Sequence, residues 1–175
     1  MGCSSEPLCA ALAAEAGNEL ADALGKIEHC LAQLTDEQVW WHSCESTNSI
    51  GNLLLHLAGN LRQWIVSGLG GAADVRDRPS EFAQRGGIGS QELLGRLRGV
   101  VGEAKAALSS LSPEELLRVR RIQGFEVNGL AAIFHAVPHF RGHTQEIVHL
   151  TRLQLGDAYR FAWQPTTAEQ GGVEG

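Results

Sequence analysis

Four long stretches of the chain place apolar residues three and four positions apart, and this spacing constrains the fold more than any other feature. It is the spacing of an amphipathic helix, which buries one face against its neighbours. The stretches run from about Glu6 to Leu34, from Thr47 to Ser67, from Ser90 to Ser110 and from Asn128 to Leu155. No clear set of alternating strands stands out. We therefore predict an all-α four-helix bundle with at least one long crossover connection.

The chain has 175 residues, a length that fits one domain of ordinary size. We expect residues 1–165 to form that domain and residues 166–175, rich in glycine, to be a flexible tail. The formal net charge of −6 argues against a nucleic-acid partner, because a nucleic-acid-binding surface needs a basic face. No long uncharged apolar stretch is present, so we expect no membrane-spanning helix. With no signal-peptide pattern and no CxxC pair, the sequence predicts a cytoplasmic protein with reduced thiols.

Histidines form the strongest functional pattern. His135, His139 and His143 follow one another at spacings of four in the last helical stretch. Residues four apart lie on one face of a helix, so His139 and His143 make an HxxxH pair that can chelate one ion. Taken alone, His56 in the second stretch would be a partly buried histidine bonded to a neighbour; beside the pair, it becomes the third ligand. Three protein ligands leave one position open, as in catalytic zinc sites.

Polar residues near these ligands are candidates for supporting roles. Glu146 follows His143 by three positions and is a general base, an orienting partner for an imidazole, or half of a surface ion pair. A polar stripe on the second stretch faces either solvent or a wet pocket, where it would orient a bound group. The stripe consists of Asn52, Asn60 and Gln63, with His56 between them.

Three other features bear on the site. Each step of four residues turns a helix by about 400°, so His135 drifts away from the face of the pair. We expect it to be exposed or to lie beside a ligand. Pro138 removes a backbone hydrogen bond just before the pair and predicts a kink in the helix. The connection from Leu69 to Gly89 is long and charged, and such connections are usually functional or mobile.

Three segments carry a resemblance to the DinB/YfiT-like metalloenzyme superfamily. They are residues 34–41, 49–60 and 139–148. The resemblance implies an up-down-down-up four-helix bundle, frequently a homodimer. It implies a divalent metal ion, zinc or nickel, held by a histidine of the second helix and the HxxxH pair of the fourth. At matching positions these are His56, His139 and His143. Some relatives use thiols, such as bacillithiol S-transferases and mycothiol-dependent maleylpyruvate isomerases.

Metal chemistry suggests what such a centre does. On zinc, the pKa of water falls from about 15.7 to about 7, and a coordinated thiol is deprotonated. We therefore expect a metal-dependent enzyme that acts on a small-molecule substrate. It would activate a low-molecular-weight thiol, as a transferase, or water, as a hydrolase. The alternatives are a non-catalytic metal-binding or stress-response protein and a plain helical interaction domain.

Overall fold

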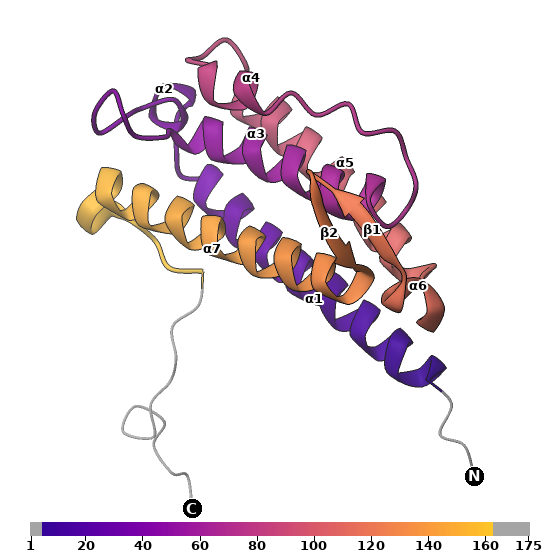
Figure 1. Cartoon of the computed structure of the whole chain (residues 1–175). Helices are drawn as coiled ribbons and strands as arrows, with labels where there is room; N and C mark the ends of the chain where they lie inside the picture. The colour runs from indigo at the N-terminus through magenta and orange to yellow at the C-terminus, as the bar shows by residue number, and fades with distance from the viewer. Residues whose placement is uncertain (1–4, 163–175) are drawn as a thin grey trace, which may run out of the picture.

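Four long helices form a bundle in the computed structural model, which describes residues 5–162 (Figure 1). They are α1 (Glu6–Leu31), α3 (Ile50–Leu61), α5 (Ser90–Ser109) and α7 (Gly129–Leu155). Helices α1 and α3 each pack against both α5 and α7. The all-α four-helix bundle is confirmed, whereas the up-down-down-up order and the domain limits 1–165 stay predictions. The predicted tail, residues 166–175, lies outside the described residues.

The apolar faces of the four helices meet in one core. Phe140 is the largest of the fully buried side chains and lies on α7, directly after His139. Neighbouring residues on a helix point about 100° apart. Burial of Phe140 therefore fixes the rotation of α7 and determines the side on which His139 emerges. Other fully buried side chains include Leu20, Ile27, Leu53, Leu57, Leu97 and Leu108.

Side-chain caps fix where the histidine-bearing helices begin. At the start of α3, Ser49 Oγ accepts a hydrogen bond from Asn52 N at 3.1 Å, and Asn52 Oδ1 accepts one from Ser49 N at 3.2 Å. At the start of α7, Asn128 Oδ1 accepts a hydrogen bond from Ala131 N at 2.8 Å. Gly156, whose φ is 52°, follows the last residue of α7 and provides the conformation that ends the helix. These signals are local, which is why the sequence shows them.

Short elements join the long helices. The π-helical turn η1 (Arg62–Ser67) continues α3 directly, so the predicted second helix changes its winding at Arg62. Such turns occur frequently at functional sites. Among residues 5–162, no helix is both long and apolar enough to span a membrane. The remaining elements are α2 (Asp36–Val39), α4 (Arg78–Ala83), α6 (Pro113–Leu117), η2 (Gly156–Ala158) and the strands β1 (Val119–Ile122) and β2 (Phe125–Asn128).

Two details differ from the sequence prediction. The first helix is predicted to reach Leu34, but α1 ends at Leu31 because Thr35 caps the separate helix α2 with its own capping box. An antiparallel hairpin of β1 and β2 stands where no strand is predicted. Each strand has four residues, too few for an alternating pattern to be visible. Gln123 and Gly124, with φ of 52° and 86°, make the tight turn between them.

Candidate metal centre

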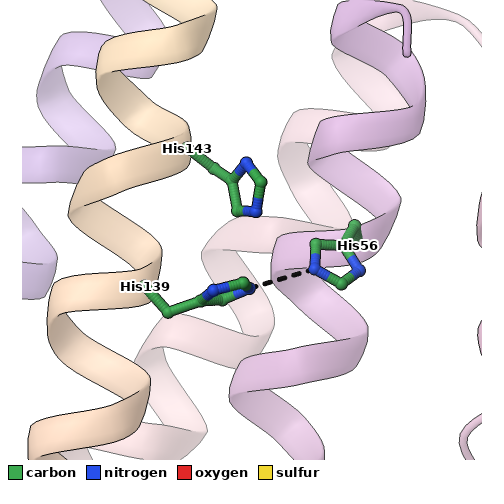
Figure 2. A group of neighbouring side chains, drawn as sticks. All are labelled: His56, His139 and His143. Carbon is green, nitrogen blue, oxygen red and sulfur yellow. Dashed lines mark hydrogen bonds between the residues drawn. The ribbon is translucent and has the colours of Figure 1, made fainter. Parts of the chain in front are cut away.

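The three histidines predicted as ligands meet between α3 and α7 (Figure 2). Each offers one ring nitrogen, and these atoms all lie within 4.8 Å of one another. Nε2 of His56 lies 3.0 Å from Nε2 of His139. His143, one turn further along α7, faces the same space. The spacing of four on α7 thus places two imidazoles opposite the one on α3.

The other ring nitrogen of His56 is held by a buried carboxylate. Nδ1 lies 2.9 Å from Glu81 Oε2, on helix α4. An ionised carboxylate only accepts hydrogen bonds, so the proton of His56 lies on Nδ1 and the lone pair of Nε2 faces the other two histidines. Arg76 Nη2 is 3.1 Å from the same Nδ1. Because Arg76 cannot donate to a protonated nitrogen, we assign its hydrogen bonds to Glu81 instead.

Those hydrogen bonds make Glu81 and Arg76 a bidentate pair. Arg76 Nε donates to Glu81 Oε1 at 2.7 Å, and Nη2 donates to Oε2 at 2.9 Å. Burial raises the pKa of Glu81, but the hydrogen bonds and positive charge of Arg76 and the bond from His56 outweigh it, and the net pKa is lowered. Glu81 is therefore anionic at neutral pH despite being buried.

His143 has a carboxylate partner on its own helix. Its Nδ1 lies 2.7 Å from Glu146 Oε2, three residues further along α7. The same reasoning places the proton of His143 on Nδ1 and the lone pair of Nε2 toward the centre. The sequence left three roles open for Glu146, namely a general base, an orienting partner for an imidazole, or half of an ion pair. The structure places it as the partner of His143.

His139 is neutral at physiological pH. Burial lowers its pKa to about 4, and the neighbouring His143, His56, His135 and Arg76 push it in the same direction. A neutral imidazole keeps a lone pair, which a metal ligand needs. His139 can therefore offer its lone pair to an ion from the α7 side of the centre.

These features fit a divalent metal ion. Two nitrogens on one tetrahedral zinc ion, each about 2.0–2.1 Å from it, lie about 3.3 Å apart. The nitrogens of His56 and His139 are 3.0 Å apart. Carboxylate partners on the far nitrogens are the usual companions of metal-binding histidines. Imidazole suits zinc, copper, iron and nickel alike, so the donor set fits divalent metals as a class.

The predicted polar stripe divides into different roles. Asn52 is fully buried; its Oδ1 accepts from Ser49, and its Nδ2 donates to the carbonyl oxygens of Glu81 and Gln84, each at 2.9 Å. Its amide is fully used, so Asn52 supports the segment that carries Glu81. The sequence showed the helix face but not the segment that covers it, and the predicted role of Asn52 in lining the pocket stays a prediction.

The other two stripe residues also have defined places. Gln63 Nε2 donates to Asp74 at 2.8 Å, and Gln63 Oε1 accepts from Arg76 at 2.9 Å, so its amide too holds the covering segment. Asn60 lies one turn after His56 and is only 5% exposed. By its position on α3, Asn60 is the stripe residue still suited to face the centre.

His135 lies outside the group of three nitrogens. Its ring stacks on Trp64 from η1, with centroids 3.7 Å apart, and is parallel to His139 at 5.7 Å. Burial lowers its pKa, with a smaller contribution from Arg76. The sequence prediction was that His135 is exposed or lies beside a ligand, and both descriptions agree with this position.

Sequence reasoning missed Arg76 and Glu81. Both belong to the connection of residues 69–89, whose length and charge mark it as functional or mobile. Nothing in its sequence says which of its charges turn inward. One general rule could have pointed to them. A metal-binding histidine usually has a hydrogen-bond partner on its second nitrogen, and the charged connection offers such partners.

Comparisons with known proteins agree with this architecture. A family model described as "Protein of unknown function (DUF1572)" matches residues 12–166. The structure is similar to that of a conserved protein from Enterococcus faecalis, with a TM-score of 0.69 and 21% identity over 81% of this chain and 95% of that one. It is also similar to a DinB-like protein from Bacillus subtilis, with a TM-score of 0.63 and 16% identity over 86% of this chain and 99% of that one.

At these identities the two solved structures show the fold alone. A search of curated proteins gives no match. The family match spans most of the chain, and both solved structures share its helical bundle. This chain therefore belongs to the DUF1572 family and shares its fold with a DinB-like protein.

Proposed function

We propose that this protein is a metal-dependent enzyme whose ion is held by His56, His139 and His143. The observation that carries the proposal is the convergence of the three ring nitrogens within 4.8 Å of one another, with carboxylates on the far side of two of them. Zinc and nickel are the ions we propose, since imidazole binds both.

The chemistry follows from the three-ligand design. A divalent ion in this centre would lower the pKa of a coordinated thiol or water molecule. The chain contributes three imidazoles, two of which have a carboxylate partner on Nδ1, Glu81 for His56 and Glu146 for His143. Three protein ligands leave a position for a further group. We propose that this group is a low-molecular-weight thiol transferred to a small electrophile, or water used in hydrolysis.

A second candidate is a non-catalytic metal-binding protein. One observation favours it. Glu146 was the main candidate for a general base, and it accepts a hydrogen bond from His143 at 2.7 Å. A carboxylate occupied in this way orients a ligand rather than moving a substrate proton. Turnover assays separate the two candidates, because both require the ion.

The first experiment measures metal content. Tag-free wild-type protein, His56→Ala and His139→Ala would be loaded with zinc or nickel, desalted and analysed by mass spectrometry of metals. We expect about one ion per wild-type chain and none in either variant, because loss of one of three ligands leaves too few. His149→Ala is the matched control, since His149 is exposed on α7 and outside the group of three. Wild-type protein without metal after loading would refute the proposal.

The second experiment tests turnover and assembly. The loaded protein would be incubated with several thiols and electrophiles and, separately, with hydrolysable esters and amides. Transfer or hydrolysis that disappears in His139→Ala supports the enzyme; stoichiometric metal without turnover supports the second candidate.

The homodimer implied by the resemblance stays a prediction, which sedimentation analysis would test. The cytoplasmic location stays a prediction too.

A further inference from the structure

We propose that Arg76 and Glu81 form a positioning pair that fixes the proton of His56 on Nδ1 and so sets the affinity of the centre for its ion. The inference rests on the metal centre proposed above and assigns roles to two residues outside it. Both belong to residues 74–84, which we call the strap. The strap contains α4 and lies against α3 (Figure 1).

Helix α3 holds Glu81 of the strap in one place through two of its residues. Asn52, one turn before His56 on α3, donates to the backbone carbonyl of Glu81 at 2.9 Å. The carboxylate rests on Gly59, where a Cβ atom would lie only 2.0 Å from Oε1. Helix α3 therefore supplies the ligand, an anchor for its partner and the space that the partner occupies.

Arg76 completes the support of the carboxylate. Its guanidinium binds both oxygens of Glu81 and also donates to Gln63 Oε1 at 2.9 Å. The side chains of Arg76 and Glu81 are 4% and 8% exposed, so little water competes for these hydrogen bonds. A carboxylate bound in this way has one oxygen, Oε2, directed at His56 Nδ1.

The contrast with Glu146 shows why this pair matters. Glu146 also bonds a ligand histidine, but its side chain is 43% exposed and its hydrogen bond spans one turn of the same helix. Exposed ion pairs are weakened by water and by side-chain entropy. Two carboxylates therefore serve two ligands with unequal strength, and the buried one has an arginine behind it.

The consequence for metal binding follows from the tautomer. With the proton on Nδ1, Nε2 of His56 keeps its lone pair facing His139 (Figure 2). Without a partner on Nδ1, the ring is free to rotate or to move its proton to Nε2, where it would block the ion. Loss of such partners elsewhere lowers metal affinity about 10- to 100-fold.

The test is a zinc-affinity series on the full chain. Glu81→Gln keeps the size of the side chain but removes its charge. If the Gln oxygen faces His56, its NH₂ group meets the donors of Arg76 and a hydrogen bond to Arg76 is lost. If the NH₂ group faces His56 instead, the hydrogen bond from His56 Nδ1 is lost. We expect zinc to bind about tenfold or more weakly, measured by competition with a chromophoric chelator. Glu146→Gln is the matched control, with a loss of less than about threefold.

A double mutant distinguishes positioning from mere attachment of the strap. Arg76→Met should also weaken zinc binding, because it frees the carboxylate. If Arg76 acts through Glu81, the variant Arg76→Met with Glu81→Gln should bind zinc about as weakly as Glu81→Gln alone. Losses that multiply would show that Arg76 only fastens the strap and would overturn its assigned role. Thermal unfolding of each metal-free variant verifies that it is folded.

Nitrogen NMR of the metal-free protein gives a readout that does not depend on the ion. We expect His56 of the wild type to carry its proton on Nδ1, and Glu81→Gln to populate the other tautomer. A wild-type His56 protonated on Nε2 alone would overturn the inference, as would zinc affinity in Glu81→Gln equal to that of the wild type. If the wild-type protein does not bind zinc, the metal centre and the effect on zinc affinity are refuted. The NMR spectrum would still show which nitrogen of His56 carries the proton.

Discussion

Gly59→Ala is the sharpest single test of how closely α3 and the strap fit together. A Cβ atom at Gly59 would lie 2.0 Å from Glu81 Oε1 and 2.9 Å from its Cδ, whereas Cβ contacts below 3.0 Å essentially never occur. The carboxylate must therefore move by about 1 Å or more. Such a shift takes Glu81 Oε2, now 2.9 Å from His56 Nδ1, to the limit of hydrogen bonding.

Two effects of opposite sign set the change in stability. Alanine favours a helix over glycine by about 1 kcal/mol. A hydrogen bond to a charged group contributes about 1.5–3 kcal/mol, so losing one outweighs that gain. We expect Gly59→Ala to lower the free energy of unfolding by about 0.5–2 kcal/mol. Zinc affinity should fall about tenfold or more, as for Glu81→Gln.

Gly102→Ala is the control for the helix effect. Gly102 lies in α5, is exposed, and a Cβ atom there would meet nothing within 4 Å. Urea unfolding should show it stabilised by up to about 1 kcal/mol, with zinc binding unchanged. If Gly59→Ala is stabilised to the same extent and binds zinc like the wild type, the close fit of Glu81 against α3 is refuted.

Three further predictions concern α7. In the metal-free protein, His139 has its pKa lowered to about 4, below the ordinary 6.5 of the unfolded chain. The unfolded state therefore takes up the proton first, and the free energy of unfolding falls by up to about 3 kcal/mol as pH drops from about 6.5 toward 4. Urea unfolding across this pH range would verify this if the midpoint falls in the wild type but stays constant in His139→Ala. Asn128→Ala removes the cap on Ala131 N and should cost about 1 kcal/mol in the same assay, with a null result contradicting the cap. Pro138→Ala restores a backbone donor at an exposed position of α7 and should stabilise the protein by up to about 3 kcal/mol, so that a lower midpoint would show that the proline is needed.

The sequence predicts well which three histidines come together, because their pattern is local. His139 and His143 share a face through their spacing of four, and His56 interrupts an apolar run. The limits of α7 are equally local, since Asn128 caps its start and Gly156 follows its end. Each of these signals lies within one helix, where spacing translates directly into geometry.

The partners of the histidines also differ in how local their contacts are. Glu146 is three residues from His143, so its contact is one of the alternatives that spacing offers. Glu81 is 25 residues from His56 and on a separate helix, and Arg76 reaches it across a loop. Such contacts depend on how the strap folds back over α3, which no periodicity in the sequence encodes. The hairpin was missed for a simpler reason, namely strands of four residues.

The unequal support of the ligands suggests how the centre works. His56 is held by a buried carboxylate with an arginine behind it, and His143 by an exposed carboxylate on its own helix. Local stability follows burial, so the α3 side of the centre is held more firmly than the α7 side. In the metal centre that we propose, we therefore expect His56 to be the more rigid ligand and His143 the one that adjusts.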